Sequence, residues 1–519
     1  MKRDKVFTAV FAVLAFATCL PIWAGHYLPL LDLPNHLSAI AVWAKLNDPD
    51  LDYSKYYTLN LKPLPYWAYY YACVLLSHLF SVETANKLFL TAYAVALPAG
   101  ALGLARRFGR SPWLSLFVFP LVWNYNLAEG FIAYCAGIAA MAIALVAVDR
   151  HCERPTILRG AWIVVIGSSI YFFHLLPYML FLVCAGLMVW MQREALRFDR
   201  LLERSVPVLL CTLVGLWAYK HNAEMGYGAP LSMKNEFLFD SLANAFSRGA
   251  GRFLNFLSSS RDEWIVVGLA VSWLGIALYA ARTRSSDERP SPRDWALEAC
   301  LAASLAAVVL LPRSMQRPFN WYMINGRFLL AAALFGALCV RGSFEGRRRW
   351  LFAPVAALGL WYAVELTVAV VRFNRHVAGF DEVVAHIPLH RSTLTLSLPP
   401  LSDPVTNVGA FNQWPSYTQI RRGGYNFYNF NYGFPLKYKT YKAAPPWNHP
   451  DHFNFEQYGA YWDYFLTHNE KAGNYHLFDK PRDEGKVRLV AEKGDWRLWE
   501  NLTRPPEDSA RSSVPRIVP

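Results

Sequence analysis

The sequence predicts a mainly α protein: a polytopic membrane helix bundle of about eleven transmembrane helices, with a small α/β extracytoplasmic domain at the C-terminus. Hydrophobic residues make up 54% of the 519 residues, and charged residues only 17%. Apolar runs of the length that a bilayer requires recur as far as residue 372. The rest of the chain is polar and rich in Pro, Asn, Tyr and Trp. We therefore expect a membrane domain over 1–372 and a soluble domain over 373–519.

The net charge of +13 does not indicate a nucleic-acid-binding protein. Much of the Lys and Arg excess lies in short turns between apolar runs, which is the distribution of cytoplasmic loops in membrane proteins. The eight cysteines fall within or beside apolar runs and form no CxxC pair. They indicate neither a disulfide framework nor a cysteine metal site.

The topology follows from the apolar runs and from the arginines between them. The basic start at residues 1–5 predicts a cytoplasmic N-terminus and an uncleaved anchor helix. Five later turns rich in arginine then fall on the same side as the N-terminus, at 106–110, 149–159, 193–204, 282–293 and 341–349. The expected spans are 6–24, 85–105, 112–124, 129–149, 160–174, 175–192, 205–220, 263–281, 295–312, 327–341 and 350–372.

One further apolar stretch, 65–80, does not fit this count. A span there would invert every later loop and place the arginine turns outside. We therefore expect a surface-lying or re-entrant helix within a first outer loop over 25–84. Its tyrosines and tryptophan suit the headgroup region of a bilayer.

The polar tail shows strand patterns near both ends. Residues 393–398 alternate like a strand, and 486–490 with 496–499 predict a hairpin around Gly494 and Asp495. Between them, 425–434 is rich in aromatic and amide side chains. This run either binds a sugar or lipid headgroup or packs its rings against the rest of the protein. The last fifteen or so residues have a disordered composition.

The clearest candidate for catalysis is Asp32, in the sequence Asp-Leu-Pro-Asn-His just after the first span. Its carboxylate either caps a helix that begins near Leu33, with Pro34 in the first turn, or serves as a base, and the two roles can coexist. His36 lies four residues on and therefore on the same helical face, where it would bind phosphate or tune the acid.

Two more polar residues border apolar runs. Glu129 stands at the entrance of a span, where a carboxylate caps the helix, pairs with a buried arginine or serves function. His174 lies in a turn between two spans, where it either binds substrate or makes an interhelical hydrogen bond.

Basic groups on the expected outer side run against the usual charge distribution and are therefore informative. Arg313, Arg317 and Arg327 would either clamp a phosphate through bidentate hydrogen bonds or extend towards lipid phosphates. Lys62 is a weaker member of this substrate-binding set.

The sequence resembles the GT-C superfamily of membrane glycosyltransferases, which includes protein O-mannosyltransferases and aminoarabinose transferases. The resemblance rests on the early outer-loop Asp, on the aromatic helix after Pro63-Leu64-Pro65, and on a following span that runs from Ala85-Asn86-Lys87-Leu88 to Arg106-Arg107. In layout it covers residues 5–372, and the residue-level match is confined mainly to 32–110. Relatives often carry an acidic pair near the first outer loop, whereas Leu33 directly follows Asp32 here.

The resemblance implies an enzyme that transfers a sugar from a polyprenyl-phosphate donor to an acceptor hydroxyl at the outer face of a bacterial inner membrane. Asp32 would be the acceptor base, and the basic residues would stabilise the leaving phosphate. The missing second acid leaves dependence on a divalent metal open. Two other classes remain: a transporter or flippase of a lipid-linked saccharide, and a non-catalytic scaffold of the cell envelope. The sugar and the acceptor are not predicted.

Overall fold

The computed structural model describes residues 4–192, 197–223, 236–250, 253–283, 291–316, 321–398, 405–426, 435–439, 453–470 and 475–504. The chain divides into two compact units. We call the first the helical unit, made of Met1–Ala24, Lys62–Tyr69 and Lys87–Val368. The second, the mixed unit, is made of Gly25–Leu61, Tyr70–Asn86 and Ala369–Pro519.

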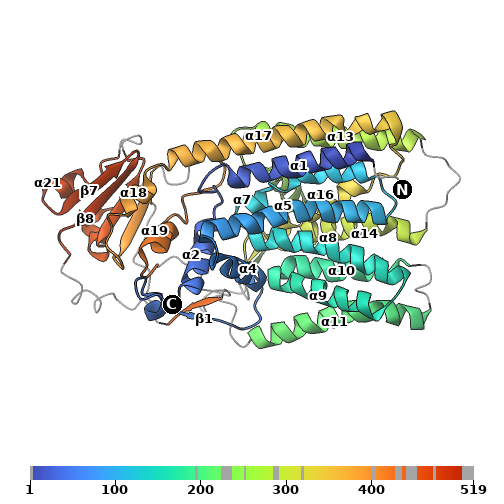
Figure 1. Ribbon diagram of the computed structural model, residues 1–519, viewed down its shortest axis with the longest axis horizontal. Helices are drawn as coiled ribbons and strands as arrows, with labels where there is room; N and C mark the ends of the chain where they lie inside the picture. The colour runs from blue at the N-terminus through green and yellow to red at the C-terminus, as the bar shows by residue number, and fades with distance from the viewer. Residues whose placement is uncertain are drawn as a thin grey trace. The chain divides into compact units, whose positions relative to one another are not determined.

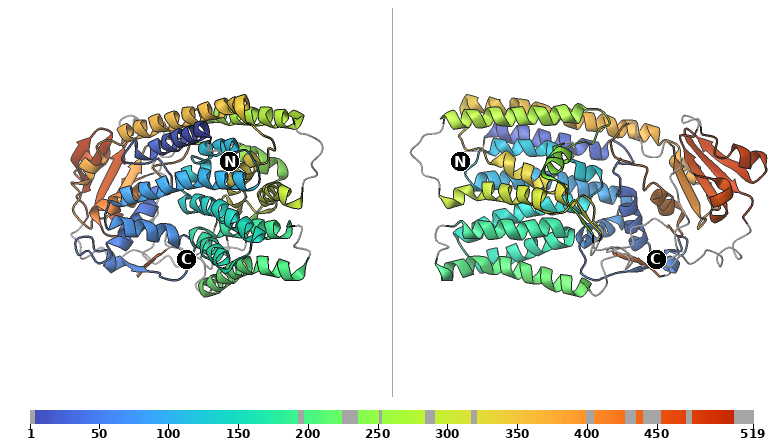
Figure 2. Two further views of the ribbon diagram at one scale, coloured as in Figure 1. Left: turned by 45° about the vertical axis from the view of Figure 1, so that its right-hand side comes forward. Right: turned by 180° about the vertical axis from the view of Figure 1, so that it is seen from behind.

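The helical unit is built from long helices that lie side by side (Figure 1, Figure 2). Neighbours in the chain pack on one another, as α8 does on α9 and α9 on α10. Short helices and a two-stranded sheet of β2 (Phe237–Leu238) and β3 (Ser314–Met315) connect them. The long helices are α1 (Lys5–Trp23), α5 (Val82–Arg107), α8 (Ile132–Glu153), α9 (Ile157–Phe173), α10 (Leu175–Trp190), α11 (Phe198–Ala223), α13 (Arg261–Thr283), α14 (Ala296–Leu310), α16 (Leu329–Leu338) and α17 (Ala353–His376).

The helices have the length and composition of membrane spans. Within the described residues, six helical segments are long and apolar enough to cross a bilayer, and three shorter apolar helices accompany them. The protein is therefore a multi-pass membrane protein, and the predicted fold class is confirmed. The six segments are Lys5–Trp23, Val82–Arg107, Ile132–Glu153, Phe198–His221, Arg261–Thr283 and Gly346–Val384.

The predicted span at 112–124 is shorter than expected. It forms a 3₁₀ helix, η1 (Pro112–Phe117), followed by the single turn of α6 (Val118–Leu121). Ten helical residues reach only about 15–20 Å, less than the hydrocarbon core of a bilayer. Apolar composition alone did not reveal this difference.

Some arginines of the predicted cytoplasmic turns form ion pairs within the helical unit. Asp149 is fully buried and accepts hydrogen bonds from Arg107 and from Arg293, the latter at 2.8 Å. Arg341 donates to Glu298 at 2.7 Å and stacks over the ring of Trp295 at 3.9 Å. Because buried charges need partners, these pairs make the arginines part of the helix packing.

The mixed unit contains a four-stranded sheet in the order β4–β6–β8–β7. β4 and β6 are parallel, and the other neighbours are antiparallel. The side chains of Leu396, Phe465 and Trp499 lie in its hydrophobic core. The strands are β4 (Thr393–Ser397), β6 (Tyr464–His468), β7 (Val487–Lys493) and β8 (Trp496–Asn501), and the short helices α18 (Phe380–Val384), α19 (Pro415–Arg422), α20 (Phe455–Tyr458) and α21 (Asp479–Asp483) accompany them.

The predicted strand patterns of the tail are confirmed. β4 covers the strand expected at 393–398, and β7 and β8 form the expected hairpin. Its two-residue turn contains Gly494 with φ +57°, a conformation that favours glycine. In the aromatic and amide run, Tyr425 stacks on Tyr57 with ring centroids 6.1 Å apart, while 427–434 lie outside the described residues.

Residues of the predicted first outer loop contribute structure to the same unit. α2 (Leu33–Ala44) and β1 (Tyr57–Leu59) come from this loop, and β1 pairs antiparallel with β5 (Leu436–Tyr438) of the tail. The stretch 65–80 forms α4 (Trp67–Ser77), so the expected helix is present. Its location at a membrane surface stays a prediction.

Candidate active site

Asp32 stands at the N-cap position of α2, as the sequence predicted. Pro34 occupies the first turn of this helix, where its missing N–H costs no hydrogen bond. The Asp32 side chain, however, makes no capping hydrogen bond to the helix. The structure therefore does not show the capping role that the sequence left open for this half-buried carboxylate.

His36 follows one turn later and is buried. Its Nδ1 lies 2.6 Å from the hydroxyl of Tyr70, on α4. The backbone N–H of His36 also donates to the carbonyl of Asp32 at 3.2 Å. α2 thus presents a carboxylate at its amino end and, one turn along, an imidazole whose orientation is fixed by a tyrosine.

A row of buried side-chain hydrogen bonds, which we call the polar seam, holds α2 against α19 and the residues just before it. Asn35 donates to Gln413 at 2.8 Å and accepts from Ser416. Ser38 donates to Gln419 at 2.5 Å, and these two α2 residues are three positions apart, on one helix face. Because buried polar groups are costly unless paired, the seam fixes the rotation of α2 and so the direction of Asp32.

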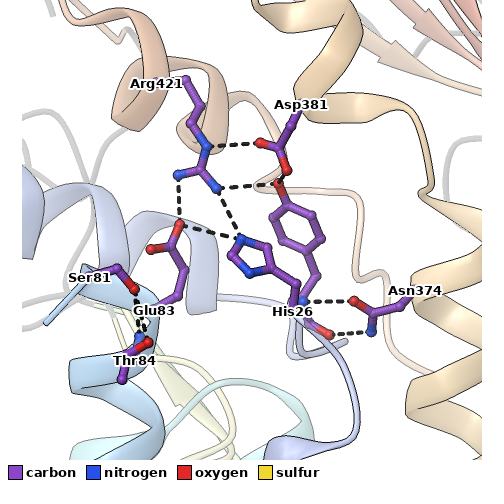
Figure 3. A network of polar contacts seen from close by, with 8 residues as sticks. His26, Ser81, Glu83, Thr84, Asn374, Asp381 and Arg421 are labelled. Carbon is purple, nitrogen blue, oxygen red and sulfur yellow. Dashed lines mark hydrogen bonds and ion pairs between the residues drawn. The ribbon is translucent and has the colours of Figure 1, made fainter.

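A second polar network of the mixed unit surrounds Arg421 (Figure 3). Its guanidinium donates to Glu83 at 2.6 Å and to Asp381 at 2.9 Å, and it lies 3.2 Å from His26 Nε2. Burial lowers the pKa of Arg421. The negative charge of Glu83 and the hydrogen bonds that the guanidinium donates to Asp381 and Glu83 raise this pKa above its usual range. Burial also raises the pKa of Tyr27, whose hydroxyl donates to Asp381. Arg421 stays charged and joins the start of α5 to α18 and α19.

The helical unit contains a different constellation, centred on His174 and Arg327. His174 lies between α9 and α10, and its Nε2 is 3.1 Å from Arg327 Nη1 and 3.2 Å from the hydroxyl of Tyr66. Arg327 also stacks over Phe131, 3.7 Å from the ring centroid, and donates to the carbonyl of Tyr322 at 2.8 Å. We call His174, Arg327 and Tyr66 the cation cluster.

The protonation of His174 follows from its hydrogen bonds. The backbone N–H of Leu176 donates to Nδ1 at 3.0 Å, so His174 caps α10 with this nitrogen. A neutral imidazole then carries its proton on Nε2, which faces both the hydroxyl of Tyr66 and Nη1 of Arg327. Nε2 is then a donor, as Nη1 of Arg327 is. The arrangement places N–H groups of an arginine and a histidine side by side, which suits an anion.

The backbone of the cation cluster is strained. Tyr66 has φ +73°, a conformation that is rare for an aromatic residue, and its N–H donates to the carbonyl of Phe173 at 3.1 Å. Met323, at the N-cap of the short helix α15 (Ile324–Arg327), has φ +54°. Strained residues of this kind are concentrated at functional sites.

The structure also describes the surroundings of three other predicted site residues. Arg313 pairs with Asp240 at 3.7 Å, and Lys62 is exposed in a bend. Glu129 is buried at the C-cap of α7 (Tyr125–Ala128), just before α8. Arg317 lies outside the described residues. Arg313 lines a small cavity with Met323, Asn325 and Gly326, next to Arg327 in the chain.

Sequence reasoning missed several partners. Tyr66 and Tyr70 were read as headgroup aromatics, whereas here they hydrogen-bond His174 and His36. The position of Glu83 was informative but was not used: a carboxylate at the start of an apolar run needs a partner. Nothing in the local sequence identified that partner as Arg421.

The helices have the length and composition of a multi-pass membrane protein, and the chain shares its fold with a solved membrane-protein structure. No family model matches the sequence, and no curated protein matches it. Among solved structures, apo ArnT from Cupriavidus metallidurans is similar, with a TM-score of 0.50 and 11% identity over 97% of this chain and 98% of that chain. ArnT from the same organism bound to undecaprenyl phosphate gives a TM-score of 0.49 and 11% identity over 97% and 99% of the chains. At this identity the likeness concerns the fold.

Proposed function

We propose that this protein is a membrane glycosyltransferase that moves a sugar from a polyprenyl-phosphate donor to an acceptor hydroxyl at the outer face of the membrane. ArnT, whose fold it shares, has been crystallised with undecaprenyl phosphate, which makes a polyprenyl phosphate the first ligand to test. The positions of the arginine turns support an outer location for the loop that contains Asp32.

The observation that carries the proposal is the position of Asp32. It stands half-buried at the amino end of α2, a helix held by a buried polar seam, one turn before His36. A carboxylate in this setting can accept the proton of an acceptor hydroxyl while that oxygen attacks the anomeric carbon. His36, fixed by Tyr70, would orient the base or the acceptor.

The cation cluster has the chemistry to stabilise a leaving phosphate. Arg327 offers a planar fork of N–H groups, and His174 and Tyr66 add a ring N–H and a hydroxyl nearby. Such donors act most strongly where charge develops away from bulk water, and His174 and Arg327 are both buried. Lys62, Glu129, Arg313 and Arg317 stay predictions as substrate-binding residues.

The test compares Asp32→Asn with Asp50→Asn, an exposed carboxylate of the same loop. Membranes that contain each variant are supplied with labelled polyprenyl-phosphate sugars, and label that leaves the donor for a product is measured. Loss of a general base lowers such a rate by about 10²–10⁴-fold. We expect this loss for Asp32→Asn only; undiminished transfer in a well-folded Asp32→Asn protein would refute the assignment.

Donor binding is tested separately with two arginines that both stack over aromatic rings. Arg327→Lys removes the planar fork from the cation cluster, whereas Arg341→Lys changes an arginine that is paired with Glu298. We expect weaker binding of undecaprenyl phosphate for Arg327→Lys than for Arg341→Lys. Equal affinities of the two variants for undecaprenyl phosphate would show that the cation cluster does not bind the donor. The proposed role of Asp32 would be unaffected.

A further inference from the structure

A second group of chemically reactive side chains lies in the mixed unit, among residues with no part in the proposed transfer. His376 is the last residue of α17, His468 is the last residue of β6, and Asp495 lies in the turn between β7 and β8. One potential ligand atom from each lies within 4.8 Å of the other two. We propose that these residues, the His–His–Asp cluster, bind one divalent transition-metal ion.

The separation of the three residues suits a metal after a small adjustment. Zinc binds imidazole nitrogen and carboxylate oxygen at about 2.0–2.2 Å, so ligand atoms of a tetrahedral site are about 3.3 Å apart. Asp495 is exposed in its turn, and its side chain can rotate towards the two rings. The imidazole centroids of His376 and His468 are already 4.8 Å apart.

Ring contacts and hydrogen bonds fix the side chain of His468, as is usual for a histidine that binds a metal. Its ring lies against Phe411, with centroids 4.8 Å apart, and against Trp496, with centroids 4.2 Å apart. Nδ1 lies 3.3 Å from the hydroxyl of Ser397, and Nε2 lies 3.3 Å from the carbonyl of His376. Whichever nitrogen binds the ion, the other keeps a hydrogen-bond partner that fixes the ring, as is usual for metal-bound histidines.

The ligand types define the class of ion. Two imidazoles and one carboxylate favour Zn²⁺, Co²⁺, Ni²⁺ or Cu²⁺, because Mg²⁺ and Ca²⁺ prefer sets made only of oxygen. Three protein ligands leave a fourth position for water or another ligand. Because the ligands come from α17, β6 and the β7–β8 turn, a bound ion would cross-link three parts of the mixed unit. This role is independent of glycosyl transfer.

The turn that carries Asp495 is itself tied to the strand end that carries His468. The N–H of Asn469 donates to the carbonyl of Asp495 at 3.0 Å, and Asn469 has φ +66°. This bond keeps the carboxylate-bearing turn beside the imidazole in the absence of an ion. The cluster is therefore partly preorganised, which lowers the cost of binding.

The experiment uses the full-length protein in detergent, purified without a histidine tag and stripped with a chelator. Zn²⁺ binding is measured by equilibrium dialysis with elemental analysis, and Co²⁺ binding by its visible spectrum. We expect one equivalent of metal in the wild type and at least a tenfold loss of affinity in His376→Ala and in Asp495→Asn. The control is His476→Ala, because His476 forms an exposed pair with Asp479 at 2.7 Å and, among the residues that the structure describes, belongs to no group of three potential ligands.

Each result of the metal-binding experiment either supports or overturns the proposed site. Metal bound by the wild type and by His476→Ala, but weakly by the two cluster variants, supports the site. No Zn²⁺ or Co²⁺ bound by the wild type, or wild-type affinity in Asp495→Asn, overturns it. Asp495 is exposed and its substitution should leave folding intact, so this variant decides the matter even if His376→Ala does not fold. The predicted base Asp32 has no part in this readout.

Discussion

His174 has two roles that two substitutions can separate. Its Nδ1 caps α10 by accepting from Leu176, and its Nε2 faces Arg327 and Tyr66. Asparagine places an oxygen near the position of Nδ1 and is a favourable N-cap residue, but its side chain does not reach the position of Nε2. His174→Asn should therefore keep the cap and lose the proposed phosphate contact, whereas His174→Ala loses both.

The structure sets the expected magnitudes. Loss of an N-cap costs about 0.5–2 kcal/mol, and His174→Ala adds the loss of packing at a buried position. A hydrogen bond to a charged group contributes about 1.5–3 kcal/mol, so loss of the Nε2 contact should weaken binding of a phosphate by roughly 10- to 150-fold. Both variants should bind donor weakly, and only His174→Ala should melt well below the wild type.

The assay combines thermal unfolding with titration of undecaprenyl phosphate in detergent. Trp321 is a natural fluorescent reporter, because its ring centroid lies 5.8 Å from that of His174. Wild-type affinity in His174→Asn would show that Nε2 does not contact the phosphate. Equal destabilisation by His174→Asn and His174→Ala would show that the cap is not what stabilises this turn.

Three further substitutions test other parts of the structure. Tyr70→Phe removes the 2.6 Å partner of His36, and we expect about a tenfold lower transfer rate with a stability loss of about 1 kcal/mol; an unchanged rate would exclude a role for this pair in catalysis. Arg421→Ala leaves the buried carboxylate of Glu83 without its guanidinium partner and should destabilise the protein by about 3 kcal/mol in thermal unfolding. Adding Glu83→Gln should restore part of that loss, and failure to do so would contradict the ion-pair explanation. Leu396→Ala opens a cavity in the core of the sheet and should cost about 2–5 kcal/mol, seen as faster proteolysis of the tail; wild-type resistance would mean that β4 contributes little to this core.

The parts of the fold that were predictable from sequence depend on local patterns. Helices such as α8 are specified by an unbroken apolar run, and the β7–β8 hairpin by alternating side chains around Gly494. The segment 112–124 has the same apolar composition as a span, but Pro120 lies within it, and it folds into short turns. Hydropathy measures composition and is insensitive to the missing N–H groups of proline.

The candidate site was predictable only in part, because its decisive contacts join distant residues. The sequence identified Asp32 at the start of a helix. Whether its carboxylate would accept a capping hydrogen bond depended on side-chain geometry, which the sequence does not give. Arg421 meets Glu83 across 338 positions of the chain, and no local pattern records that contact. The sequence likewise showed His174 in a turn, but not that its Nε2 would face a guanidinium.

Arg327 and Arg341 show why arginines near membrane helices cannot be interpreted from charge distribution alone. Each lies over an aromatic ring, at 3.7 and 3.9 Å, so desolvation and stacking are similar. Two N–H groups of Arg341 point at one carboxylate oxygen of Glu298, and that ion pair uses the charge to hold helices together. Nη1 of Arg327 instead lies 3.1 Å from Nε2 of His174, and Arg327 also donates to the carbonyl of Tyr322. In our proposal a phosphate oxygen accepts from Arg327 and from the His174 ring, whereas the charge of Arg341 is already shared with Glu298.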